Sequence, residues 1–243
     1  MTPRLLTIPI SHYCEKARWA LDRAGIAFAE ERHLQVIHIW KAWRAGGGRT
    51  VPVLITDGAI LTDSTAILEW VNGRLPPDER LYPDAVASEV RRIEEWLDTG
   101  LGPDGRLWMY HETLPTIQDL GPWANAGVPD WERLAFQAKA GRVLDPIIRR
   151  YLGVDDNAAA KALRDIERVF DAIAGMLADG RPYLTGERFT AADLTFAALS
   201  APVTVPAGYG LELPPLEVLP PAMAREVERL RAHPAGVFAA RVY

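Results

Sequence analysis

The two residues with the clearest chemistry in this sequence are Ser11 and Cys14. They lie between a short apolar run, Leu5 to Ile10, which predicts a strand, and a helical pattern from about Glu15 to Ala24. The first turn of a helix has unpaired amides and the positive end of the helix dipole, so it favours an anion. Ser11 and Cys14 have the spacing of a C-x-x-C redox pair whose first cysteine has become serine. Such a site cannot form its own disulfide, but it can stabilise the thiolate of a bound thiol.

Cys14 is the single cysteine of the chain, and its sequence context allows two interpretations. One turn beyond Ser11 on a helix, a small apolar residue is commonly buried against the sheet. The alternative is a redox nucleophile that forms a mixed disulfide with a small thiol. We favour the buried, structural interpretation.

Two dipeptides further along the chain could hold the backbone of a ligand. A cis peptide bond in Val51-Pro52 would present the backbone of Val51 to a ligand, whereas a trans proline, the commoner form, would only open the next strand. Asp63-Ser64 begins a predicted helix, where Asp63 alone is explained as an N-cap. As a functional pair, Asp63 could hold an ammonium while Ser64 and nearby amides hold a carboxylate, which is what an α-amino acid group requires.

These residues fall in an N-terminal region of mixed strand and helix patterns with the order βαβ, α, ββα. Asp57-Gly58 between two apolar runs predicts a hairpin, so the last two strands should be antiparallel neighbours. The expected strands are Leu5–Ile10, Ala27–Leu34, Val53–Thr56 and Ala59–Leu61. The expected helices are Glu15–Ala24, an irregular one at Ile37–Ala45, and one that is capped at Asp63 and ends at Asn72-Gly73.

After about residue 75 the chain changes character, and we expect a linker followed by an all-helical domain. Leu75-Pro76-Pro77 and Leu81-Tyr82-Pro83 indicate the linker. The expected helices are one that contains Ile93 to Leu97 and ends near Gly100 to Gly105, and others at Trp131–Tyr151, Ala158–Ala178, Ala191–Leu199 and Pro221–Ala232. The predicted domains are therefore residues 1–75 and 87–243, joined by residues 76–86.

Composition narrows the classes of protein to which this chain can belong. Its 243 residues are 49% hydrophobic and 24% charged, which suits a globular protein with a substantial core. A net charge of −5 without a basic block argues against nucleic-acid binding. A single cysteine excludes an internal disulfide, and no apolar run approaches a membrane span or a signal segment. We expect a cytoplasmic protein that binds neither membrane nor nucleic acid.

Taken together, these motifs resemble the cytosolic glutathione transferases with a serine-type active site. The resemblance extends across nearly the whole chain and rests on five motifs in order. They are Ser11 to Arg18, Thr50 to Leu54, Asp63 to Ile67, Leu81-Tyr82-Pro83, and Phe189 to Leu194, where Thr190 and Asp193 also form a variant capping box. The resemblance implies a thioredoxin-like N-terminal domain that binds glutathione and a helical domain that shapes the second-substrate pocket.

The resemblance also implies roles for particular residues. Ser11 would be the catalytic hydroxyl, Val51 would pair its backbone with glutathione before a cis Pro52, and Asp63 with Ser64 would hold the γ-glutamyl end. The chain has His12 where many serine-type members have proline, Thr50 where several have glutamine, and Asp63 where glutamate is usual. The glycyl carboxylate needs a donor, and the candidates are His38, Lys41 and Arg44, which share one helical face that is equally well explained as a solvated basic face.

The second-substrate pocket should be lined by aromatic residues of the segment between the helices that contain Trp96 and Trp131. The candidates are Trp108, Tyr110 and Trp123 of this segment, together with His12. For any single one of the three aromatics we favour ordinary core packing. The function that we expect is a glutathione transferase that stabilises the glutathione thiolate for attack on a small hydrophobic electrophile, acting as a homodimer without a metal. A glutathione-dependent lyase, isomerase or peroxidase, and a noncatalytic ligand-binding protein on the same fold, are the alternatives.

Overall fold

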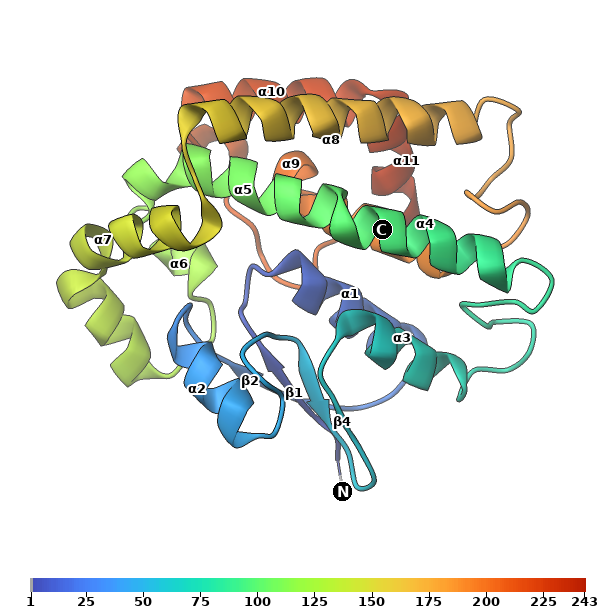
Figure 1. Cartoon of the computed structure of the whole chain (residues 1–243), viewed down its shortest axis with the longest axis horizontal. Coiled ribbons are helices and arrows are strands. Elements are labelled where there is room, and N and C mark those ends of the chain that lie inside the picture. Colours follow the sequence, from blue (N-terminus) through green and yellow to red (C-terminus); the bar gives the residue numbers. More distant parts are fainter. Residues whose placement is uncertain (1) are drawn as a thin grey trace.

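A four-stranded sheet with helices packed on it leads into a larger bundle of helices (Figure 1). The computed structural model describes the backbone of residues 2–243 and the side chains of residues 2–135 and 146–243. The order of elements confirms the predicted fold class, a thioredoxin-like α/β domain followed by an all-helical domain. The predicted hairpin is also confirmed, because the two strands around Asp57-Gly58 pair antiparallel.

The strands have the order β2-β1-β3-β4, with β1 parallel to β2 and antiparallel to β3. Their bounds are Arg4–Thr7 for β1, Ala29–Arg32 for β2, Val53–Ile55 for β3 and Ile60–Leu61 for β4. Successive side chains of a strand point to opposite faces of the sheet. Leu5 and Leu54 therefore belong to the main core, whereas Leu6 and Val53 pack with Ala42 on the other face.

Three helices in residues 2–72 cover the two faces of this sheet. They are α1 (His12–Arg23), α2 (Ile37–Arg44) and α3 (Ser64–Asn72). Helices α1 and α3 lie between the sheet and the helical domain, and α2 lies on the opposite face (Figure 1). The main core is continuous from Leu5 through α1 and α3 to Phe196, so the two domains share one apolar interior.

The helical domain is built around α9 (Ala191–Thr204), which is buried along its whole length. Such a helix is apolar on all sides and must lie inside a bundle. Its N-terminus confirms the capping box, because the Asp193 carboxylate accepts from Thr190 N at 2.7 Å. The surrounding helices are α4 (Ala87–Thr99), α5 (Leu101–Thr113), α6 (Gly121–Ala124), α7 (Asp130–Leu152), α8 (Asp156–Met176), α10 (Pro221–Ala232) and α11 (Pro234–Val242), with short 3-10 turns η1 (Leu114–Thr116) and η2 (Leu216–Val218).

The helices differ from those expected in several places. Helix α1 begins at His12, three residues earlier than expected, and Ser11 is its N-cap. Helix α4 ends at Thr99, as expected, but the glycine-rich stretch after it begins a helix that was not expected, α5, which runs from Leu101 to Thr113. Gly102 serves close packing there, since a Cβ atom would lie only 2.6 Å from the Tyr13 ring carbon Cζ. Helix α11 was not expected.

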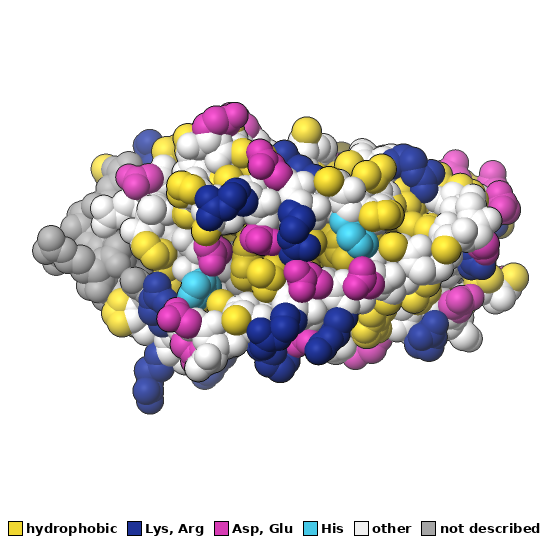
Figure 2. All heavy atoms as spheres, turned by 90° about the horizontal axis from the view of Figure 1, so that it is seen from above, with side chains coloured by type: hydrophobic (Ala, Val, Ile, Leu, Met, Phe, Trp, Pro, Cys, Tyr) yellow, Lys and Arg dark blue, Asp and Glu magenta, His cyan; other side chains and the backbone are white. Residues whose placement is uncertain are grey.

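The outer face formed by α8 and α10 carries acidic and basic side chains side by side (Figure 2). Ion pairs connect Asp165 with Lys161 and with Arg168, and Arg229 connects Glu226 with Glu167. Such a mixed surface is typical of a solvated face. Within the described residues, none of the helices combines the length and the apolar character needed to cross a bilayer.

Candidate functional site

A cleft with a volume of about 290 Å³ lies between the two domains, and several of the predicted site residues line it. One wall comes from the N-terminal domain and the other from α5 and α7. Of the predicted residues, the cleft brings together Ser11, His12, His38, Thr50, Val51 and Tyr110. It does not include Pro52, Lys41, Asp63, Ser64, Trp108 or Trp123.

Ser11 caps the N-terminus of α1 and lines the cleft. Its backbone is extended, and its Oγ accepts a long hydrogen bond of 3.4 Å from Cys14 N. The hydroxyl proton has no acceptor among the described residues. A group in the cleft beside Ser11 therefore meets a hydroxyl donor and the positive end of a helix together, which favours a negatively charged atom.

The residues that follow Ser11 are tied to the helical domain. His12 is 3% exposed, and its Nε2 lies 3.0 Å from the carbonyl oxygen of Gly102. Burial and then the positive charge of Arg106 lower the pKa of His12 to about 3, so the ring is neutral at physiological pH and Nε2–H donates. The Tyr13 hydroxyl donates to the Asp98 carbonyl at 2.7 Å. These two hydrogen bonds tie the start of α1, next to Ser11, to α5 and α4.

Cys14 is fully buried, in agreement with the structural interpretation of this residue. Burial raises the pKa of its thiol to about 11, which keeps the thiol protonated. A thiol in this state is a poor nucleophile.

The peptide bond between Val51 and Pro52 is cis. Thr50 and Val51 line the cleft next to it, together with Arg49, whose side chain is exposed. His38 also lines the cleft, and its buried Nδ1 has no hydrogen-bond partner in the described part of the chain. Lys41 lies away from the cleft and directs its ammonium at the Trp40 ring, 5.4 Å from the ring centre. Of the predicted basic group, only His38 reaches this cleft.

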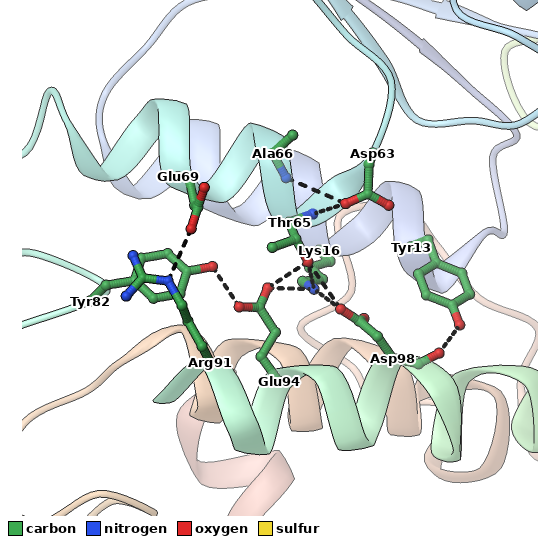
Figure 3. Close-up of polar contacts among 10 residues, drawn as sticks. All are labelled: Tyr13, Lys16, Asp63, Thr65, Ala66, Glu69, Tyr82, Arg91, Glu94 and Asp98. Carbon is green, nitrogen blue, oxygen red and sulfur yellow. Dashed lines mark hydrogen bonds and ion pairs between the residues drawn. The ribbon is translucent and has the colours of Figure 1, made fainter. Parts of the chain in front are cut away.

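Asp63 is the N-cap of α3 and accepts from Thr65 N at 2.8 Å, and Ser64 is buried beside it. A buried network of hydrogen bonds and ion pairs contacts the first turn of α3 (Figure 3). Lys16 Nζ lies 2.7 Å from both Glu94 and Asp98 and 3.2 Å from Thr65 Oγ1. This network joins α1, α3 and α4 and thereby fixes Asp63 relative to Tyr13.

The three candidate pocket aromatics occupy different surroundings. Tyr110 lies on the cleft wall, and its hydroxyl accepts from Gln35 Nε2 at 3.3 Å. Trp123 lines a second, apolar cavity, which is formed mostly by the helical domain and which Gln35 and Tyr110 also border. Trp108 is 3% exposed, packs in the main core and does not line the cleft. Trp108 and Tyr110 lie on α5, and Trp123 lies on α6.

Several cleft residues carry no local sequence signal. Arg106 lies on α5, and Ile147, Ile148 and Tyr151 come from α7. Helix α7 is attached to the N-terminal domain by Glu132, whose two carboxylate oxygens accept from Leu34 N at 2.8 Å and pair with His33 Nδ1 at 2.7 Å. Only the fold brings these helices to the site. Among the described residues there is no group of three or more histidine, cysteine, aspartate or glutamate side chains that could hold a metal ion.

Two family models match the chain. The model of the glutathione S-transferase N-terminal domain matches residues 5–79, and that of the glutathione S-transferase C-terminal domain matches residues 156–225. Together they cover more than half of the sequence. A comparison with curated protein sequences gave no match.

Solved structures of similar fold include three bacterial proteins. A glutathione S-transferase from Xanthobacter autotrophicus Py2 is 17% identical over 99% of this chain and 91% of its own, with a TM-score of 0.62. The beta-etherase LigF from Sphingobium sp. strain SYK-6 is 19% identical over 100% of both chains, with a TM-score of 0.61. A theta class glutathione S-transferase from Xanthomonas axonopodis pv. citri, with glutathione bound, is 20% identical over 96% of this chain and 94% of its own, with a TM-score of 0.59.

Proposed function

The chain belongs to the glutathione S-transferase family, and from this premise we propose that it binds glutathione in the cleft between its domains and uses the thiol of the tripeptide to attack an electrophile. The observation that carries the proposal is the position of Ser11, a helix N-cap with an uncommitted hydroxyl proton on the wall of the cleft. Val51 and the cis bond to Pro52 lie on the same wall.

In the proposed reaction Ser11 stabilises the thiolate of glutathione. A free thiol with a pKa near 8.5 is only about 3% ionised at neutral pH. A hydrogen bond from a hydroxyl to a thiolate contributes about 1.5–3 kcal/mol, and a helix N-terminus adds roughly 0.3–1 kcal/mol. These contributions lower the pKa of the bound thiol by on the order of two units. The Tyr13 hydroxyl is committed to the Asp98 carbonyl, which leaves Ser11 as the donor beside the sulfur.

The remaining groups of glutathione have candidate partners on the N-terminal domain. Val51 would pair its backbone with the cysteinyl part. The Asp63 carboxylate would hold the ammonium of the γ-glutamyl end, and Ser64 with the first amides of α3 would hold its carboxylate. For the glycyl carboxylate the candidates that line the cleft are the exposed Arg49 and the half-buried His38, whose Nδ1 has no partner among the described residues, whereas Lys41 lies away from the cleft.

The second substrate would lie against the helical domain, where Tyr110, Ile148 and Tyr151 line the cleft. These side chains suit a small hydrophobic electrophile, which the cleft would hold beside the sulfur.

A lyase is the second candidate function, because the structurally similar LigF, which this chain matches along its whole length, is a beta-etherase. In that reaction the thiolate would attack a carbon that carries an ether oxygen, a carbon–sulfur bond would form, and the alcohol or phenol would leave. Product analysis with a panel of halide and ether substrates separates the two reactions.

Glutathione binding is tested by retention on immobilised glutathione, elution with the free tripeptide, and calorimetry. Asp63→Asn is a matched variant, because asparagine keeps the N-cap but loses the charge. We expect the parent protein to be retained. The dissociation constant for glutathione should rise about 10- to 100-fold in the variant, because a charge-assisted hydrogen bond is lost. Failure of the parent protein to bind glutathione at millimolar concentration would instead support a noncatalytic protein on the same fold.

A further inference from the structure

Arg106 is a half-buried cation without a partner. It lies on α5 in the wall of the cleft, and no hydrogen bond or ion pair joins its guanidinium to any residue that the structure describes. Several other arginines that are half-buried or buried have carboxylate partners. Arg32 pairs with Glu30 at 2.7 Å, and Arg181 pairs with Asp179 at 2.6 Å. An unpaired guanidinium that is partly removed from water is unfavourable unless something else binds it.

Arg106 lines the cleft together with the aromatic residues His12, Tyr13 and Tyr110. Its positive charge acts with burial to lower the pKa of His12. The described side chains that line the cleft include two arginines and no aspartate or glutamate, in a chain whose net charge is −5. The cleft is therefore a locally positive site in an acidic protein, which attracts anions.

The anion that pairs with the Arg106 guanidinium should not be glutathione. The residues proposed to bind the three charged groups of glutathione all belong to the N-terminal domain, whereas Arg106 belongs to the helical domain. They are Asp63, Ser64, His38 and Arg49. Its neighbours along α5, Met109 and Tyr110, line the side of the cleft assigned to the second substrate.

We propose that Arg106 is a specificity-determining residue that selects an aromatic electrophile carrying a carboxylate. The guanidinium pairs with the carboxylate in two parallel hydrogen bonds, and the rings of Tyr13 and Tyr110 contact the aromatic body. This inference rests on the proposed function for turnover, but the binding of an aromatic carboxylate does not depend on it.

The test for turnover compares a chloro-dinitrobenzoate, with chlorine para to the carboxylate, with its methyl ester. In both substrates the glutathione sulfur forms a bond to the ring carbon and chloride leaves. We expect kcat/KM to be higher for the carboxylate than for the ester. The ratio of the two kcat/KM values should fall about 10- to 100-fold in Arg106→Leu, and Arg106→Lys should keep part of this preference for the carboxylate. Arg49→Leu, which also removes a cleft arginine, should keep this ratio and weaken glutathione binding.

A binding experiment separates failure of this inference from failure of the proposed function. Dinitrobenzoate without chlorine cannot react, and calorimetry measures its binding to the protein in the absence of glutathione. We expect the dissociation constant to rise about 10- to 100-fold in Arg106→Leu, even if no turnover is found. An unchanged dissociation constant in Arg106→Leu would overturn the inference. The inference would also be overturned if Arg106→Leu lost as much glutathione affinity as Arg49→Leu.

Discussion

Ser11 and His12 are adjacent in the sequence, but the fold gives them different surroundings. The Ser11 side chain lies on the cleft wall, and its hydroxyl proton has no acceptor in the part of the chain that the structure describes, whereas His12 is buried and donates to the Gly102 carbonyl. The bond from His12 connects the start of α1 with the start of α5. The geometry at Ser11 therefore depends on a neutral histidine next to it.

The low pKa of His12 predicts a loss of stability in mild acid. The unfolded chain takes up the proton near pH 6.5, whereas the folded chain resists it down to about pH 3. Between these values the unfolded state binds more protons, so the free energy of unfolding falls as the pH falls, by up to about 1.4 kcal/mol per pH unit. Urea unfolding at several pH values measures this. His12→Gln removes the titration and should show a shallower pH dependence, and an equal slope in both proteins would contradict the explanation.

Sequence patterns singled out some of the candidate site residues and missed others for a physical reason. Ser11, Val51 and Asp63 lie at element boundaries, where the local chemistry of caps and turns restricts the residue type. Arg106 lies in the middle of a helix, where any residue type with good helix propensity is expected. Its proposed role depends on the lack of a carboxylate partner among the described residues, which only the packing of α5 in the fold determines.

At the scale of elements, the buried network at Lys16 determines how α1, α3 and α4 meet (Figure 3). Lys16 is fully buried between Glu94 and Asp98, and Tyr82 donates to the second oxygen of Glu94 at 2.6 Å. Burial raises the pKa of Asp98, although its contact with Lys16 opposes this rise. The same network contacts Thr65 in the first turn of α3, so it also positions Asp63.

Removal of the Lys16 charge should destabilise the protein strongly. Lys16→Met leaves Glu94 and Asp98 buried without a cation, which costs about 3–5 kcal/mol of the free energy of unfolding. The additional change Asp98→Asn should recover part of this loss. Denaturant unfolding of the single and double variants measures both effects. Lys161→Met, which breaks an exposed ion pair with Asp165, is the control and should change the midpoint little. Equal midpoints for Lys16→Met and the control would contradict this account.

The element that sequence patterns described least well is α5. Glycine usually disfavours a helix. We therefore expected a helix to end near Gly100 to Gly105, as α4 does at Thr99, but not that another would begin at Leu101. Tertiary contacts prevail here, because Gly102 packs against the Tyr13 ring and the missing side chain makes room for it. The β-hairpin and the capping box were predicted correctly, since both depend on residues close in sequence.

At the scale of the molecule, the region between the two family-model matches builds much of the cleft. Helices α5 to α7 lie wholly within residues 80–155, which neither model covers. They supply Arg106, Tyr110 and Tyr151 to the cleft, and Glu132 attaches α7 to the N-terminal domain. The proposed glutathione site thus uses the part of the chain that the N-terminal model matches, whereas Arg106 and Tyr110 of the proposed specificity site come from the part that neither model matches.

We also predict that the protein is a homodimer, as the family resemblance implies, with the N-terminal domain of one subunit against the helical domain of the other. Closed two-fold dimers are the commonest oligomers. Sedimentation at micromolar concentration should give a species of about twice the 26.9 kDa chain mass. A single species near the chain mass would refute the prediction.

The central claim is that Ser11, and not Cys14, activates the bound thiol. The most direct measurement is the ultraviolet absorbance of the glutathione thiolate in the complex against pH, together with the rate of conjugation, in the parent protein, Ser11→Ala and Cys14→Ala. In Ser11→Ala the pKa of the bound thiol should rise toward about 8.5, and turnover at neutral pH should fall roughly 10- to 100-fold, with glutathione affinity little changed. Cys14→Ala should keep both the low pKa and the activity. An inactive Cys14→Ala beside a nearly normal Ser11→Ala would contradict the account and indicate a thiol–disulfide enzyme.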